Sequence, residues 1–360
     1  MRTETIRVDK GLEGVEVGET AISLVDGERG NLSYRGVGVD DLVTRPFSEV
    51  AAWVLTGEPG RDFEAELAAA GSLSRWEATS VLNLPDTTHP MHVLQSMTPV
   101  LERSDVFHAF GEVGHGLTIA AKLPAIIATY LMREDALETG ITNYIERFLT
   151  QIGAPVSGVA REAFEVMQIL QIEHGFNAST FAGRVVASTL APVENVLAAA
   201  IGTLHGRLHG GADQAALETA DGLSSPEQAR TFVDRCIAEK ARVMGMGHRE
   251  YRVVDPRAKY AKRLAAELTR GTEHEATFEV LKAIEERFTE RMAEKDRALY
   301  ANIEFYKGLI FRALGLPTRF FTTSFAMARV FGYVAHFMES RIDNRLIRPA
   351  VRYVGPCPGR

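Results

Sequence analysis

Three histidines next to glycine-rich or polar turns, His174, His209 and His248, stand out in a sequence that otherwise favours helices. Together with the acid Glu304 they occur in four polar segments at helix boundaries: EHGFNAST (173–180), GRLHGGADQA (206–215), MGMGHREYRVVDPRA (244–258) and ANIEFYKG (301–308). Glycine lets the backbone approach a ligand closely, and histidine supplies a neutral donor or a proton carrier near pH 7. We therefore expect these loops to converge on one cleft.

Two kinds of site fit these residues poorly. The three histidines could form a metal site, but none of them shows a paired ligand spacing such as HExxH, so we expect no metal. An acyl-enzyme mechanism would need a nucleophile in a strained strand-to-helix turn. The chain has no GxSxG segment and no serine or cysteine in such a setting.

Proton abstraction beside a carbonyl, followed by carbon–carbon bond formation, fits the same residues better. This reaction needs a carboxylate base and donors to the developing enolate and to the electrophilic carbonyl. Glu304 can act as the base, and His209 and His248 can act as the donors. Arginines would grip a dicarboxylate electrophile through paired hydrogen bonds. The candidate arginines are Arg257, Arg329 and Arg348.

The elements that must position these loops are almost all helices. A β-hairpin is predicted over residues 20–36, where two β-rich runs flank a turn rich in Asp, Gly and Asn. The first helical pattern after it has Ser48 as its expected N-cap and ends at Gly57. The small, apolar segment 178–205 reads as helix with a break at Pro192. The predicted fold class is all-α with a small N-terminal β-hairpin.

Composition and charge exclude several classes of protein. The chain has 360 residues, of which 46% are hydrophobic and 24% charged, as in a globular protein with a large core. The net charge is −7, although residues 241–360 carry 22 Lys/Arg against 14 Asp/Glu. These basic residues are scattered arginines without an RNP-like motif or a Cys/His finger, so we expect no nucleic-acid partner.

The sequence also indicates a cytoplasmic protein that is not inserted in a membrane. The longest apolar stretch, residues 123–132, is well short of the roughly 20 residues that span a bilayer. The N-terminus has no apolar signal-peptide core. The two cysteines, Cys236 and Cys357, can form neither a disulfide scaffold nor a multi-cysteine zinc site, and we expect both thiols to be reduced.

Six segments of the chain, taken in order, carry a resemblance to a known family: EHGFNAST, LHGGADQAAL, MGMGHREYRVVDPRAKY, NIEFYKGLIFRALG, FAMAR and NRLIRPAVRYVGP. Together they closely resemble the citrate synthase family in its short bacterial and archaeal form. The segment GLEGVEVGETAISLVDGERGNLSYRG also resembles the family's opening hairpin. The resemblance spans essentially the whole chain, and the combination of HGG, GHR…DPR and the C-terminal arginine segments is highly specific.

The resemblance implies a fold, an assembly and a reaction. It implies a mostly helical, two-domain homodimer that condenses acetyl-CoA with oxaloacetate and water to citrate and CoA, without a metal or other cofactor. The large domain would comprise residues 1–210 and 316–360, and the small domain residues 211–315. Closure of the domains would then assemble the site and exclude water.

The resemblance also implies roles for single residues. His209 matches the histidine that donates to the enol oxygen of acetyl-CoA, and His248 matches the one that polarises the oxaloacetate ketone. The residues that match oxaloacetate ligands are His174, Arg257 and Arg329. Arg348 matches an arginine that reaches the active site of the partner subunit. The residues expected near the CoA phosphates are Arg252 and Arg249.

The sequence departs from the family pattern at the base. The family has an aspartate in a PNVDFYSG-like segment, whereas ANIEFYKG places Glu304 there, with Ala301 for the proline and Lys307 for a small polar residue. Glutamate is one methylene longer, so its carboxylate would lie about 1.5 Å further out. A misplacement near 1 Å can cost on the order of 100-fold in rate. Further departures are Arg207, Thr323–Ser324 and Asp213, of which we expect the last to be without consequence.

Three interpretations remain open at this point. The chain can be a citrate synthase that uses a glutamate base, or a 2-methylcitrate synthase that uses propionyl-CoA. It can also be a weakly active or non-catalytic binding paralogue. One extra methylene in an acyl pocket is worth only about 1–3 kcal/mol, so the sequence does not separate the first two.

Overall fold

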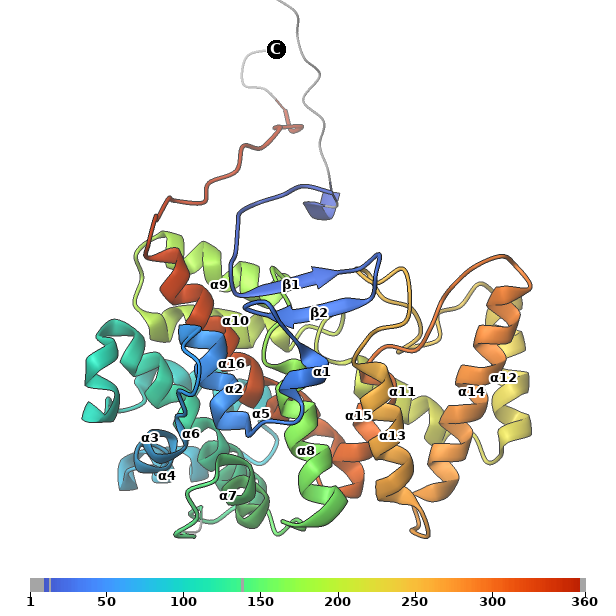
Figure 1. The fold of residues 1–360 in the computed structure, drawn as a ribbon, viewed down its shortest axis with the longest axis horizontal. Helices are drawn as coiled ribbons and strands as arrows, with labels where there is room; N and C mark the ends of the chain where they lie inside the picture. Colours follow the sequence, from blue (N-terminus) through green and yellow to red (C-terminus); the bar gives the residue numbers. More distant parts are fainter. Residues whose placement is uncertain (1–9, 13, 137–138, 357–360) are drawn as a thin grey trace, which may run out of the picture.

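A small antiparallel sheet lies against a body of helices in this computed structural model, which describes residues 10–12, 14–136 and 139–356 (Figure 1). Strand β1 (Ser23–Asp26) pairs with β2 (Asn31–Tyr34), with Ser23 opposite Tyr34, and the short β3 (Val37–Gly38) pairs with β2. The predicted hairpin is confirmed, and so is the all-α fold class. Cys357 lies outside the described residues, while Cys236 is a buried free thiol.

Two long helices form the centre of the larger group of helices. Almost every residue of α16 (Phe321–Ser340) and most of α6 (Glu112–Met132) are buried, and the two helices pack on each other. The helices around them are α1 (Val39–Leu42), α2 (Phe47–Thr56), α3 (Glu64–Ala70), α4 (Arg75–Leu82), α5 (Pro90–Met97), α7 (Tyr144–Gln151), α8 (Gly158–Gln171), α9 (Ala178–Ser188) and α10 (Val193–Leu204). Short 3-10 turns lie at Lys10–Leu12, Thr98–Val100, Asp105–Phe110 and Thr318–Phe320.

Helix α6 is longer than the apolar stretch that the sequence suggested. By length and composition it could cross a membrane, but 89% of its apolar window is buried inside the protein. A helix that is apolar on all sides is expected at the centre of a large helical core. The burial of α6 is therefore explained by its packing under α3, α4, α5, α10 and α16.

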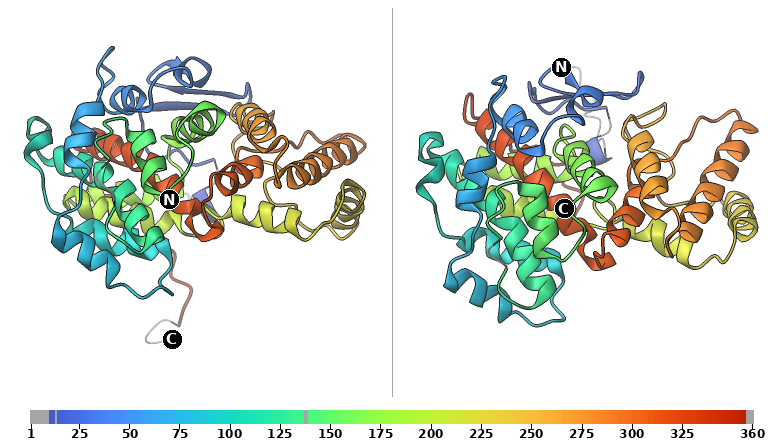
Figure 2. Two further views of the ribbon diagram at one scale, coloured as in Figure 1. Left: turned by 90° about the horizontal axis from the view of Figure 1, so that it is seen from below. Right: turned by 60° about the horizontal axis from the view of Figure 1, so that its bottom comes forward.

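A second group of helices lies beside the first and packs mainly on itself. Its members are α11 (Ala212–Asp221), α12 (Pro226–Ala238), α13 (Ala258–Thr269), α14 (Glu275–Ala293) and α15 (Glu304–Ala313). Helices α12 and α14 form its outer edge, and α8 joins the two groups through contacts with α13 and α15 (Figures 1 and 2). After α16, Arg341, Asn344 and Ile347 are hydrogen-bonded to the end of α9 and the loop after it. The exposed residues 348–356 then leave the body (Figure 1).

The predicted cap of α2 is wrong in detail. The helix begins at Phe47 after Pro46, and Ser48 lies buried inside its first turn without a hydrogen-bond partner for its hydroxyl. Proline can stand at the entry of a helix because its missing N–H would have no partner there. The predicted end is correct, since Gly57 closes the helix with φ of 70°. The predicted break at Pro192 separates α9 from α10.

Candidate active site

The loop between α12 and α13 fixes the ring of His248. The Nδ1 atom accepts hydrogen bonds from the backbone N–H groups of Glu250 at 3.0 Å and Tyr251 at 3.3 Å. A neutral ring that accepts at Nδ1 carries its proton on Nε2, which makes Nε2 a hydrogen-bond donor. Nε2 lies 3.4 Å from Nη2 of Arg257, so the donor and the guanidinium face the same region.

Arg257 is held by an aspartate two residues before it. The Nε and Nη2 atoms of Arg257 donate to the two carboxylate oxygens of Asp255, each at 2.9 Å, and both side chains are buried. Burial alone would raise the pKa of Asp255, but the charge of Arg257 and its hydrogen bonds to the carboxylate together outweigh it, so the pKa lies below its ordinary value. Asp255 also accepts the backbone N–H of Ile303 at 3.2 Å. This bond ties the DPR segment to the residue before Glu304.

His174 lies next to His248 and shares a neighbour with it. The two ring centroids are 5.5 Å apart, and His174 Nε2 lies 3.2 Å from the hydroxyl of Tyr251. The backbone of this loop is fixed by the buried carboxylate of Glu173, which accepts from Ser23 on β1 and from His336 on α16, each at 3.0 Å. The hairpin, the central helix and the loop are therefore joined at one point.

The tip of the hairpin packs directly on the His248 loop. The backbone N–H of Arg252 donates to the carbonyl oxygen of Gly27 at 2.9 Å. A Cβ atom on Gly27 would lie 2.0 Å from the carbonyl oxygen of Glu250, so only glycine permits this approach. The hairpin thus supports the loop that carries His248.

His209 is oriented from the other side of the site. Its Nε2 lies 2.7 Å from Ser179 Oγ. The Ser179 hydroxyl accepts a hydrogen bond from Tyr333 OH at 2.7 Å and donates to Asn177 Oδ1 at 2.7 Å. The ring centroid of His209 is 6.4 Å from that of Phe325 on α16. This arrangement occupies Nε2 and leaves Nδ1 as the nitrogen available to a ligand.

The three histidines are neutral at physiological pH. Burial, followed by the positive charges of Arg329 and Lys307, lowers the pKa of His209 to about 4. Burial and Arg257 lower the pKa of His248 to about 4, and burial with Arg257 and His248 lowers the pKa of His174 well below its ordinary value. Neutral imidazoles are suited to donate hydrogen bonds to a developing oxyanion without giving up a full proton in advance.

Glu304 is the first residue of α15, and its side chain is 14% exposed. Its Oε2 makes an ion pair with Lys307 one turn further along the helix. Lys307 is fully buried, lies 3.3 Å from Asp213 Oδ2 and donates to Gln171 Oε1 at 2.9 Å. Asp213, which the sequence analysis treated as without consequence, is thus a buried partner of the cation beside the expected base.

Arg329 reaches the same region from α16. It is 2% exposed, its Nε donates to the backbone oxygen of Gln171 at 2.6 Å, and its Cζ lies 4.7 Å from the ring centroid of Phe325. Its charge contributes to the low pKa of His174 and of His209. The guanidinium is therefore close enough to act on both sides of the site.

The remaining expected residues lie at the edge of the site or outside it. Arg252 and Arg249 are exposed, and Arg249 Nη2 donates to the backbone oxygen of Gly11 at 3.1 Å. Arg348 is exposed in the segment that leaves the body after α16. Among the described residues no group of three or more His, Cys, Asp or Glu is placed to hold a metal ion.

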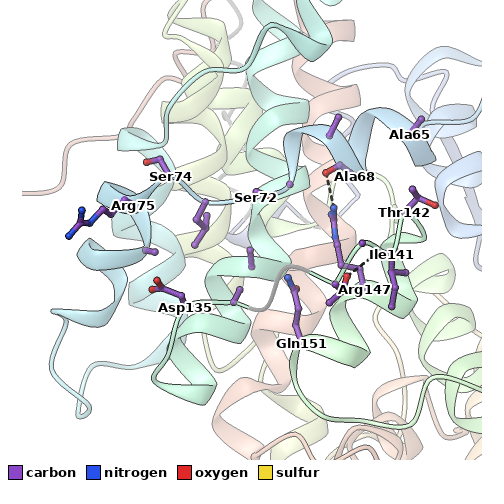
Figure 3. Close-up of a pocket in the computed structure, with 18 residues that line it drawn as sticks. Ala65, Ala68, Ser72, Ser74, Arg75, Asp135, Ile141, Thr142, Arg147 and Gln151 are labelled. Atoms are coloured by element: carbon purple, nitrogen blue, oxygen red, sulfur yellow. Dashed lines mark hydrogen bonds between the residues drawn. The ribbon is translucent and has the colours of Figure 1, made fainter.

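A cavity of about 630 Å³ lies elsewhere in the fold (Figure 3). It is lined by α3, α4, α6 and α7 and by the loops next to them, and alanine is its most frequent lining residue. Its buried arginine, Arg147, donates to the backbone oxygens of Leu67 and Ala68. None of the histidines or acids described above lines this cavity, so it is distinct from the candidate site.

Comparison with known proteins identifies the family. Residues 11–350 match the family described as "Citrate synthase, C-terminal domain". The chain is 34% identical to a citrate synthase from Synechocystis sp. over 99% of this chain and 93% of that protein. It is 33% identical to a 2-methylcitrate synthase from Shewanella oneidensis over 97% of this chain and 95% of that protein. The chain belongs to the citrate synthase family.

The fold agrees with that assignment. The crystal structure of citrate synthase from Thermotoga maritima superimposes with a TM-score of 0.87, covers 98% of each chain and is 30% identical. The citrate synthase family consists of acyltransferases, so the chain is an enzyme of that class. The two kinds of relative, named for citrate and for 2-methylcitrate, are similarly distant from it.

Several residues of the candidate site were not singled out by the sequence analysis. Asp255 and Tyr251 lie inside the segment MGMGHREYRVVDPRA, and an aspartate two residues before an arginine could have been recognised as its holder. Ser179 lies in EHGFNAST, but its contact with His209 depends on the packing of α9 against α10. Gln171 gave no signal, because an amide inside an apolar helix is indistinguishable by pattern from a satisfied core residue.

Proposed function

We propose that the protein is a citrate synthase, which condenses acetyl-CoA with oxaloacetate and water to give citrate and free CoA. One observation carries the proposal: Asp255 joins Arg257 of the His248 loop to the residue before Glu304, and the Lys307 partner of Glu304 lies on the ring of Phe325, which Arg329 and His209 also approach. Membership of the citrate synthase family supports it. No residue among these is needed to hold a cofactor, because both reactants are substrates.

Formation of the enol is the first chemical step that we assign. Glu304 takes a proton from the methyl group of acetyl-CoA, and His209 donates a hydrogen bond from Nδ1 to the thioester oxygen as it gains charge. In the structure the Ser179 hydroxyl donates to Asn177 Oδ1. This role requires the hydroxyl to turn its single proton to His209 Nε2, so that the ring proton resides on Nδ1.

Carbon–carbon bond formation is the second step. The enol carbon attacks the ketone carbon of oxaloacetate, and the ketone oxygen takes a proton from Nε2 of His248. Water then hydrolyses the thioester of the condensation product and releases CoA. The protonation state of His248 and the backbone bonds to its Nδ1 support this role.

The oxaloacetate carboxylates are assigned to Arg257 and Arg329, with His174 as a further ligand. The buried pair with Asp255 supports a fixed orientation for Arg257, since a guanidinium held by two hydrogen bonds has little rotamer freedom to lose. Arg252 and Arg249 are assigned to the CoA phosphates, where exposed arginines at the rim can reach a polyanion.

Residues 211–315 are proposed to form a small domain that closes on residues 1–210 and 316–360. The packing of α11–α15 mainly on one another supports this division. His248 and Glu304 would then move with the small domain and Arg329 would stay with the large one. Closure would bring them together around the substrates and exclude water.

A homodimer, in a cytoplasmic location, completes the proposed assembly. Apolar side chains are widely exposed in the segment that carries Arg348, with Val351 91% and Val354 89% exposed. Exposed apolar residues on an extended segment are typical of an arm that packs on another subunit. Arg348 would then reach the active site of the partner.

Use of propionyl-CoA, as by a 2-methylcitrate synthase, is the second candidate. It remains a candidate because the chain is 34% identical to a citrate synthase and 33% identical to a 2-methylcitrate synthase. The deciding experiment measures thiol release from acetyl-CoA and from propionyl-CoA with oxaloacetate present and absent. A citrate synthase gives the larger kcat/KM with acetyl-CoA, whereas a larger value with propionyl-CoA would favour the second candidate. Release from neither would favour a binding paralogue.

A further inference from the structure

Lys307 is a buried cation that contacts two carboxylates. Its side chain has no exposed surface, it makes an ion pair with Glu304 on its own helix, and it lies 3.3 Å from Asp213 on α11. Its ammonium also donates to Gln171 on α8 at 2.9 Å and lies 4.5 Å from the ring centroid of Phe325 on α16. Four elements therefore fix one ammonium.

Neither carboxylate has another hydrogen bond at the oxygen that faces this ammonium. Glu304 Oε2 and Asp213 Oδ2 are both buried and have no hydrogen-bond partner among the described residues. The other charged or titratable groups that face the cluster are Arg329 and the neutral His209. Both carboxylate oxygens thus depend on Lys307 for their stabilisation.

A buried ammonium with two carboxylates leaves one negative charge in excess. Two carboxylates that share one site without a cation cannot both remain ionised, and one of them retains a proton. Even with the ammonium present, burial and the charge of Glu304 raise the pKa of Asp213. Lys307 is therefore the positive charge that offsets the repulsion between the two carboxylates.

We propose that Lys307, with Asp213 as its counter-charge, is a positioning residue that holds the Glu304 carboxylate in place and keeps it ionised for proton abstraction. The inference rests on the proposed role of Glu304 as the base. The i, i+3 spacing lets the longer glutamate side chain fold back along α15 onto the ammonium. An aspartate at position 304 would end about one C–C bond short of that contact.

The test compares the pH dependence of kcat/KM for the enzyme and three variants: Lys307→Met, Asp213→Asn and the double variant. Methionine keeps the unbranched shape of the lysine and removes its charge, and asparagine is nearly isosteric with aspartate. On the acidic side of the pH profile, kcat/KM falls as the essential base of the free enzyme becomes protonated. The position of this acidic limb therefore reports the ionisation of the base. Oxaloacetate and acetyl-CoA are the substrates, and thiol release is the readout.

In Lys307→Met the two carboxylates face each other without a cation, so the acidic limb should move to higher pH by at least about one unit. That displacement is about a tenfold loss of kcat/KM on the acidic side, with recovery at high pH. Adding Asp213→Asn should move the limb back, because the competing carboxylate is gone. Asp213→Asn alone should move the limb to lower pH, because the ammonium then acts on Glu304 alone.

A uniform loss of kcat/KM at every pH, without movement of the limb and without rescue in the double variant, would assign Lys307 a merely structural role and overturn the inference. If Lys307→Met does not fold, Asp213→Asn still decides, since an unmoved acidic limb in that variant would also overturn it. Glu304→Gln separates this result from the proposed function. Near-normal turnover of Glu304→Gln would refute the base itself, and with it the inference.

Discussion

Replacement of Gly27 by alanine should damage catalysis from outside the group of residues assigned to the chemistry. The added Cβ would lie 2.0 Å from the carbonyl oxygen of Glu250, whereas ordinary van der Waals contact begins at 3.4 Å. The position of the added Cβ is fixed by the backbone of residue 27, and the oxygen that it meets belongs to the backbone of Glu250. No side chain can therefore rotate away to make room. The hairpin tip and the loop that carries His248 must therefore separate by more than 1 Å.

A misplacement of this size costs on the order of 100-fold in rate when it moves a catalytic group. We therefore expect kcat for oxaloacetate-dependent thiol release to fall about 100-fold in Gly27→Ala. Gly38→Ala is the matched control in the same sheet, since its φ of −64° suits alanine and no atom lies within 4 Å of the added Cβ. Gly38→Ala should stay within about twofold of the wild type.

The comparison of the two variants decides whether the hairpin positions the site. Circular dichroism would establish that both variants keep their helical content, so that a lower rate cannot be attributed to unfolding. If Gly27→Ala turns over within about threefold of Gly38→Ala, the hairpin does not hold His248 in place, and the reasoning fails.

Two further predictions concern single arginine and histidine side chains. His248→Ala should lower kcat about 100- to 1000-fold with the fold intact, because it removes the donor that we assign to the ketone oxygen; turnover near the wild-type rate would remove His248 from the mechanism. Arg348→Ala should weaken oxaloacetate binding, and mixed dimers with one Arg348→Ala chain and one Glu304→Ala chain should retain about one working site. If Arg348 crosses to the partner, both lesions fall in the same site and the other site stays intact. Inactive mixed dimers would therefore refute the crossing of Arg348.

The hairpin and the ends of two helices could be predicted from short sequence segments, because neighbouring residues determine them. The hairpin follows from β-rich runs around a Gly-rich turn, and the ends of α2 and α9 follow from Gly57 and the break before Pro192. The cap at Ser48 was wrong because the entry of a helix depends on the preceding chain direction, which Pro46 sets. Segment 173–180 contacts both of the other histidines, since the ring centroids of His174 and His248 are 5.5 Å apart and Ser179 Oγ lies 2.7 Å from His209 Nε2.

The assembly around Glu304 could not be predicted in the same way. Lys307 stands three residues after Glu304, so an ion pair between them was the alternative to a catalytic role, and such pairing along one helix follows from the spacing. Nothing local indicated that Asp213 faces the same lysine. Their contact depends on how α11 packs against α15, with Gln171 supplied by α8. Such contacts between distant segments are determined by tertiary packing, which periodicity alone does not specify.

The central claim is that Glu304 takes the proton from acetyl-CoA. The direct measurement is the rate of oxaloacetate-dependent thiol release from acetyl-CoA by Glu304→Gln, with oxaloacetate binding measured by calorimetry on the same preparation. An amide keeps the shape of the side chain but cannot accept the proton, so turnover should fall at least about 1000-fold while oxaloacetate still binds. Turnover within a few-fold of the wild type would contradict the claim and leave Glu304 only as the ion-pair partner of Lys307.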